Sequence, residues 1–191
     1  MHNYKTTEAC DRERRPKLDL VAPGMTERNW NQAEVLGATI WLWMHSPVHR
    51  NLPVHTLPSL LLPAIERRQF VLGSQAGKPL FYMSWAKFDL QAEARYLQRH
   101  SALMPAADWD SGNRLWIVDW VAPFGHTQTL ARIVRRRLFR QWMGRMFYHR
   151  EDQRGVKIMR FRGSAVLPDD AQIWFEANPL AHPGDTRPVA L

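Results

Sequence analysis

The sequence predicts a single α/β or α+β domain in which one mixed sheet carries helices on its faces. Of the 191 residues, 45% are hydrophobic and 23% are charged, which is the balance of one folded domain with one core. Apolar residues recur at helical spacing in some segments and form strand-like runs in others. Because the two kinds of segment are interleaved along the chain, helices are expected to pack on the sheet.

The two ends of the chain differ in composition from the middle. Residues 1–25 hold scattered charges without an apolar period, which predicts a flexible leader. The folded domain is predicted over residues 26–177. Proline and glycine recur in residues 178–191, which are therefore expected to form a loose tail.

The elements of the domain follow from periodicity and from turn residues. A first helix is expected from a cap at Thr26 to the break at Ser46-Pro47. The basic segment after Gly125 has apolar residues on one side and arginines around the other, which predicts an amphipathic helix. The remaining predicted elements are a short helix over 57–68, strands over 69–72 and 79–88, a helix over 90–98, a strand over 114–121, and strands over 146–150 and 156–162 across a turn at Gly155.

Composition also limits the cellular compartments and the classes of partner that can be expected. No apolar run reaches the roughly 20 residues of a membrane helix, and the start lacks the apolar stretch of a signal peptide, so we expect a cytoplasmic protein without a membrane span. The single cysteine, Cys10, excludes an internal disulfide. A net charge of +8 would attract a nucleic acid, an anionic membrane or an acidic carrier protein. No recognisable nucleic-acid motif is present, so no nucleic-acid partner is expected.

Asp119 lies in a strand-like run, LWIVDWV, in which every neighbour is apolar. A buried carboxylate needs a positive or hydrogen-bonding partner, and a carboxylate on a strand is well suited to orient a histidine. The structural alternative is an aspartate that accepts backbone N–H groups at a bulge or a sheet edge. The residue pattern alone leaves both interpretations open.

His49 follows the break at Ser46-Pro47, on a predicted loop where a side chain can meet a substrate. A loop histidine is more often an ordinary polar residue, so this position alone assigns no role. Ser46 is either a nucleophile that a base activates or a turn residue, and the turn role is favoured. The spacing of His45, His49 and His55 matches no known ligand motif, so no metal is expected.

The segment from Gly125 to Thr127 leads from a strand into the basic helix. Free N–H groups at such a helix start can hold a phosphate. Arg135, Arg136 and Arg137 form a run that is usually only a solvated helix face, although it could also attract an anionic partner. The absence of a G-x-x-x-x-G-K loop argues against nucleotide chemistry.

Three segments resemble the RTX toxin-activating lysine acyltransferases in sequence and in order. Residues 34–53 read EVLGATIWLWMHSPVHRNLP, residues 82–90 read YMSWAKFDL, and residues 109–125 read WDSGNRLWIVDWVAPFG. With a weaker match at VKIMRFRG, the resemblance covers about residues 33–163. Two long motifs with tryptophans in register are far more specific than a short pattern.

The resemblance implies an enzyme that moves a fatty acyl group from acyl carrier protein to internal lysines of an RTX protoxin. It implies a fold like that of the GCN5-related N-acetyltransferases, and it suggests a homodimer. It places the catalytic pair on His49 and Asp119 and the motif serine on Ser46. No cofactor is expected beyond the phosphopantetheine arm of the carrier. Donor contacts are expected at Gly125, Thr127, Arg135 and Arg136.

Two other functions remain as alternatives. A generic amine N-acyltransferase would use acyl-CoA, and a basic nucleic-acid-binding protein is the less favoured possibility. The segment Gly125-His126-Thr127-Gln128 is not the R-x-x-G-x-G phosphate loop of ordinary acetyltransferases. Acetyl-CoA is therefore expected to be a poor donor.

Overall fold

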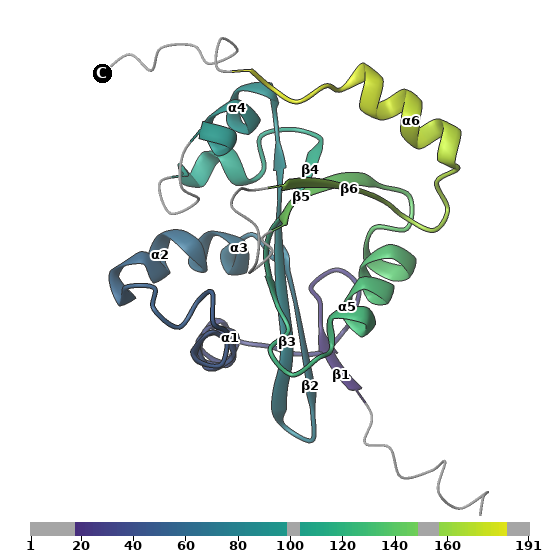
Figure 1. Cartoon of the computed structure of the whole chain (residues 1–191). Coiled ribbons are helices and arrows are strands. Elements are labelled where there is room, and N and C mark those ends of the chain that lie inside the picture. The colour runs from purple at the N-terminus through teal and green to yellow at the C-terminus, as the bar shows by residue number, and fades with distance from the viewer. Residues whose placement is uncertain (1–17, 99–103, 149–156, 183–191) are drawn as a thin grey trace, which may run out of the picture.

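One six-stranded sheet divides the molecule into two layers of helices (Figure 1). The computed structural model describes residues 18–98, 104–148 and 157–182. Helices α1 to α4 lie on one face of the sheet and α5 lies on the other. In chain order the elements are β1 (Leu18–Val21), α1 (Gln32–Met44), the 3-10 turn η1 (Val54–Thr56), α2 (Leu57–Leu60), α3 (Leu62–Glu66), β2 (Phe70–Gln75), β3 (Lys78–Phe88), α4 (Leu90–Gln98), the 3-10 turn η3 (Ala106–Trp109), β4 (Arg114–Val121), α5 (Thr127–Ile133), the π-helical turn η4 (Val134–Leu138), β5 (Met143–Tyr148), β6 (Lys157–Arg162) and α6 (Pro168–Ala177).

The strands lie in the sheet in the order in which they occur in the chain. All neighbours are antiparallel except β4 and β5, which run parallel from the pair Leu115–Gly144 to the pair Ile117–Met146. A parallel pair needs a crossover connection, and α5 with η4 provides it. Strands β2 and β3 form a hairpin whose two turn residues, Ala76 and Gly77, have φ of 49° and 78°. Such left-handed turns suit the twist of a hairpin.

Each face of the sheet buries its own apolar cluster. On the α5 face, Met83 and Ile117 pack with Leu130 of the helix. On the α1 face, Leu42 packs with Tyr82. Successive side chains of a strand point to opposite faces, so neighbouring residues of β3 can serve both clusters. The predicted class, a single-domain mixed sheet flanked by helices, is confirmed, and it is consistent with an acetyltransferase-like fold.

The prediction of a flexible leader over residues 1–25 is wrong for Leu18–Val21. This segment forms the edge strand β1, which pairs antiparallel with β2 from the pair Leu18–Gln75 to the pair Val21–Leu72. Such a short alternating run carries too little periodicity to be recognised, and only the partner strand defines it. Residues 1–17 lie outside the described part of the chain.

The first helix begins later than its predicted cap. Asn31 caps α1, because its side-chain oxygen accepts a hydrogen bond from the N–H of Glu34 at 2.8 Å. The hydroxyl of Thr26 instead bonds to the backbone of Ala22. Thr26 therefore closes a turn after β1, and the predicted helix start is wrong.

The C-terminal part of the chain is more ordered than predicted. Residues 168–177 form α6, which was not among the predicted elements. The loose tail is wrong at its beginning, since the carbonyls of Asn178 and Pro179 accept hydrogen bonds from the buried guanidinium groups of Arg145 and Arg114. The predicted turn at Gly155 and residues 183–191 lie outside the described residues.

Glu93 of α4 is a fully buried carboxylate that joins four parts of the fold. It accepts hydrogen bonds from Arg114 at 2.6 Å, from Arg145 at 3.0 Å, from the indole of Trp116 at 2.7 Å and from the N–H of Ala181 at 3.1 Å. These donors come from β4, β5 and the segment after α6. A buried charge with this many donors ties α4 and the C-terminal segment to the sheet.

We expect Glu93→Gln to lower the free energy of unfolding by about 3–5 kcal/mol, because two buried guanidinium groups would lose their counter-charge. Urea unfolding followed by circular dichroism measures the change. Glu176→Gln is the matched control, since Glu176 lies exposed on α6. Equal midpoints for the two variants would show that the buried cluster contributes nothing to stability.

Candidate active site

The loop after α1 brings Ser46 and His49 close together. Pro47 cannot continue a helix, and the chain turns so that the carbonyl of Ser46 accepts hydrogen bonds from the N–H groups of His49 at 3.1 Å and Arg50 at 3.0 Å. The Ser46 hydroxyl lies 2.7 Å from Nδ1 of His49. The turn therefore presents the imidazole beside the end of α1.

Asp119 reaches the same place from the centre of β4 through a β-bulge. Ser84 of β3 pairs with Asp119 and Trp85 pairs with Ile117, so Val118 is an extra residue in the ladder. Strict alternation would place Asp119 on the α5 face together with Ile117. The extra residue shifts the alternation and directs the carboxylate to the α1 face. Bulges are common next to active sites, where they redirect a side chain in this way.

The carboxylate and the imidazole form a close, shielded pair. Nε2 of His49 lies 3.0 Å from Oδ1 of Asp119, and the indole Nε1 of Trp43 donates to Oδ2 at 3.1 Å. The side chains of His49 and Asp119 are only 14% and 12% exposed. The ring centroids of Trp43 and His49 are 5.0 Å apart, so the indole both shields the pair and holds the carboxylate.

The contacts determine which nitrogen of the neutral His49 ring carries the proton. A carboxylate only accepts hydrogen bonds, so Nε2, which faces Asp119, must be the donor. Nδ1 is then the basic nitrogen, and it accepts the hydroxyl hydrogen of Ser46. The three groups share the logic of a Ser-His-Asp triad, with the two ring nitrogens exchanged relative to the usual order.

Asp119 also influences the buried tyrosines. Burial first, and then the negative charge of Asp119, raise the pKa of Tyr82 and of Tyr96 above the ordinary tyrosine range. Both phenols therefore stay protonated at physiological pH and cannot act as bases.

The structure brings together His49, Asp119 and Ser46. The turn interpretation of Ser46 describes its backbone correctly, but its hydroxyl also contacts His49. Asp119 is held by side chains of distant segments, and in this it differs from the structural alternative of backbone N–H donors. Trp43 was not among the predicted site residues. Its indole N–H, which needs a partner when buried, was the available signal.

The predicted donor-binding residues follow β4 along the chain. Gly125, with φ of 82°, and Thr127 form the turn and the helix start that follow β4. Arg135 and Arg136 lie in η4, which continues α5 on the α5 side of the sheet. The side chain of Arg135 donates to the carbonyl of Arg162 at 3.3 Å. Donor binding by these four residues stays a prediction.

Two further properties concern metals and membranes. Residues 18–98, 104–148 and 157–182 contain no group of three or more His, Cys, Asp or Glu side chains placed to hold a metal ion. The absence of a metal from the chemistry stays a prediction. No helix of this described part is long and apolar enough to cross a bilayer.

A shielded imidazole with a carboxylate on one nitrogen and a hydroxyl on the other is an arrangement that suits proton or acyl transfer through a histidine. The model of the RTX toxin acyltransferase family matches residues 28–162, which include all of these groups. The chain belongs to this family.

Curated relatives agree with the family model. The chain is 45% identical over 107 residues to the RTX-II toxin-activating lysine-acyltransferase of Actinobacillus pleuropneumoniae, covering 56% of this chain and 66% of the relative. It is 40% identical over 136 residues to the RTX-I toxin-activating lysine-acyltransferase of the same organism, which covers 71% of this chain and 78% of the relative. A protein-lysine myristoyltransferase of Escherichia coli is 43% identical over 104 residues, which covers 54% of this chain and 61% of the relative. The chain thus spans about two thirds of the length of these relatives.

We expect Trp43→Phe to lower kcat by about tenfold, because Asp119 would lose the indole donor that fixes its second oxygen while the packing area is largely kept. The measurement is the steady-state rate of acyl transfer. Trp41→Phe is the matched control, since Trp41 lies on the same helix and its ring contacts Phe124 and His45. Equal losses in both variants would mean that the indole hydrogen bond has no role of its own.

Proposed function

We propose that this protein is a lysine acyltransferase that moves a fatty acyl group from acyl carrier protein to internal lysines of an RTX protoxin and so activates the toxin. The observation that supports this most directly is the 3.0 Å contact between His49 and Asp119 in a chain of this family. The curated relatives are named for toxin activation and for lysine acylation. The proposal places the reaction in the cytoplasm, and a homodimer belongs to it as well.

The acceptor amine explains why a base is needed. A lysine with a pKa of about 10.4 is almost wholly protonated at neutral pH and cannot attack a thioester in that form. In the proposed mechanism the ammonium first releases one proton to solvent. Nδ1 of His49 then takes the second proton as the neutral amine attacks the thioester carbonyl, and Asp119 stabilises the imidazolium through Nε2. The carbon–sulfur bond then breaks, and the imidazolium returns the proton to the departing thiolate.

Ser46 occupies the basic nitrogen in the described conformation. Its hydroxyl either moves aside when the amine arrives or passes the proton from the amine to Nδ1. In both cases the hydroxyl orients the free imidazole before the substrate binds. Ser46 is therefore a positioning residue in this proposal. The acceptor amine either replaces the Ser46 hydroxyl at Nδ1 or forms a hydrogen bond with that hydroxyl.

Two observations support a carrier protein with a phosphopantetheine arm as the donor. The chain carries a net charge of +8, which would attract an acidic carrier. The pairing of β4 with β5 ends at Ile117 and Met146, just before the bulge that bears Asp119. Backbone groups of residues 118–121 on that side can bond the two amides of such an arm, which would bring the thioester toward the pair.

The substrate assignment is tested by mass spectrometry of an RTX protoxin co-expressed with and without this protein. The expected result is a fatty acyl mass increment on lysine only when the protein is present. Acylation that requires acyl-CoA and ignores acyl carrier protein would instead support the generic N-acyltransferase. The absence of any increment on the protoxin would contradict the proposed function.

We expect His49→Ala to lose acyl transfer by roughly 10²–10⁴-fold while carrier protein still binds. Asp119→Asn should also lose transfer without unfolding. Raising the pH should partly restore His49→Ala, because more of the acceptor lysine is then neutral. Single-turnover rates over a pH series measure this rescue.

The rival to the base mechanism is a covalent acyl group on Nδ1 of His49. Incubating the protein with acyl carrier protein and no toxin, followed by peptide mass spectrometry, separates the two. A stoichiometric acyl group on His49 would establish covalent catalysis and overturn the general-base proposal.

We expect acyl transfer from carrier protein to slow as ionic strength rises, because attraction between exposed charges is screened beyond about 10 Å at 0.1 M salt. Charge reversal at Arg135 or Arg136 should raise KM for carrier protein at low salt and flatten the salt dependence. The structure places both on the α5 side of the sheet, so a parent-like KM in both variants would show that the carrier docks elsewhere.

A further inference from the structure

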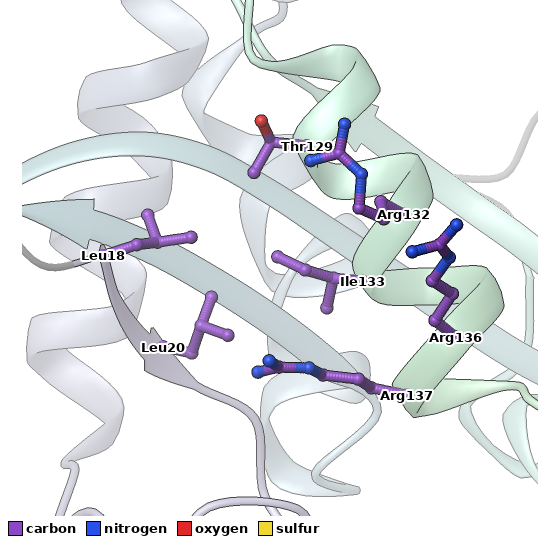
Figure 2. Close-up of a pocket in the computed structure, with 7 residues that line it drawn as sticks. All are labelled: Leu18, Leu20, Thr129, Arg132, Ile133, Arg136 and Arg137. Carbon is purple, nitrogen blue, oxygen red and sulfur yellow. The ribbon is translucent and has the colours of Figure 1, made fainter.

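A pocket of about 480 Å³ lies between the edge strand β1 and the helical segment formed by α5 and η4 (Figure 2). One wall comes from Leu18 and Leu20, which alternate onto the same face of β1. The facing wall comes from one side of the helical segment. Its residues recur at helical spacing and are Thr129, Arg132, Ile133, Arg136 and Arg137.

The pocket combines an apolar floor with a cationic rim. Leu18 and Leu20 are half-buried, and Ile133 points at them from the helix in Figure 2. The side chain of Arg137 reaches across the gap toward Leu20. Among the described residues, the lining thus holds three guanidinium groups around a small apolar surface and includes no carboxylate.

Within the part of the chain that the structure describes, the charge of this rim is not neutralised. Arg132, Arg136 and Arg137 are exposed, and none of them forms an ion pair with another described residue. The acidic residue of β1, Asp19, alternates away from the pocket and pairs with Arg28 at 3.5 Å. An anion that enters the pocket would therefore meet free guanidinium donors.

These features define the chemistry of the ligand. Guanidinium groups bind carboxylates and phosphates through paired hydrogen bonds and are weakly hydrated, so they tolerate neighbouring apolar surface. Leu18, Leu20 and Ile133 favour an aliphatic chain beside that anion. The volume falls within the roughly 300–1,000 Å³ of pockets that hold one ligand molecule. Arg136 and Arg137 also lie in the π-helical turn, a distortion that recurs at functional sites.

We propose that this pocket binds a single-chain amphiphilic anion, with its carboxylate or phosphate on the three arginines and its chain against the two leucines. The pocket lies on the α5 face of the sheet, whereas His49 and Asp119 lie on the α1 face. The ligand is therefore bound apart from the reacting atoms. Arg136 is shared with the proposed carrier-docking surface, but the pocket also has Arg132 and Arg137 and its own apolar wall, so its ligand is tested without an acyl donor or acceptor.

The test is isothermal titration calorimetry of the full chain with octanoate, octyl phosphate and inorganic phosphate below micellar concentrations. We expect both amphiphiles to bind at least about tenfold more tightly than inorganic phosphate, and each added methylene to tighten binding by about two- to fourfold. Tighter binding of octanoate would indicate a fatty carboxylate, and tighter binding of octyl phosphate would indicate a phospholipid-type headgroup. If neither binds more tightly than inorganic phosphate, the proposal is overturned.

Variants locate the site. Arg137→Gln should weaken octyl phosphate binding by about tenfold, since it removes one charge-assisted contact. Arg140→Gln, an exposed arginine of the next turn that does not line the pocket, should leave binding unchanged. Thermal unfolding of both variants checks the fold. Two results would overturn the proposal: equal weakening in the two variants, or capture of phosphatidylglycerol vesicles without binding of the soluble amphiphiles. Either result would indicate a general attraction to anionic surfaces.

Discussion

The carboxylate of Asp119 is the group on which the arrangement of the site depends. Burial of an unpartnered carboxylate is strongly unfavourable, so the fold must supply donors to it. The donors come from Trp43 and His49, which lie 76 and 70 residues away in the chain. Each of the two carboxylate oxygens accepts from a different donor. The end of α1, the loop after it and the centre of β4 therefore take fixed positions relative to one another.

Glu93 shows a different solution to the same constraint. Its partners include two guanidinium groups, which only donate hydrogen bonds, so the cluster is fixed and holds α4 and the C-terminal segment in place. The partner of Asp119 is an imidazole, a side chain that carries both a donor and an acceptor nitrogen and can therefore pass on a proton. The first carboxylate therefore serves the fold, and the second can serve chemistry.

The sheet separates two kinds of surface. The α1 face carries the shielded imidazole, with its polar atoms committed to Ser46 and Asp119. The α5 face carries the exposed arginines of the helical crossover. A parallel pair of neighbouring strands requires a crossover, and in this fold the crossover is the basic helix on the α5 face. The imidazole and the exposed arginines are thus separated by one layer of strands.

The sequence by itself determined the class of fold and most of the central elements. The helix over residues 90–98 and the strand over 114–121 agree with their predicted bounds. In such segments the pattern of apolar and polar residues shows which side chains are buried. It also identified Asp119 as anomalous, since a lone carboxylate among apolar neighbours is visible without a structure. The motifs that carry the family resemblance lie in the same segments.

Only the tertiary structure decided what those residues contact. The strand β1 has too few residues to show a period, and it exists because β2 offers a partner. The face on which Asp119 lies depends on one extra residue, Val118, that only the pairing with β3 reveals. The roles of Trp43 and of the two nitrogens of His49 likewise follow from contacts across about 70 residues of chain, which local patterns cannot encode.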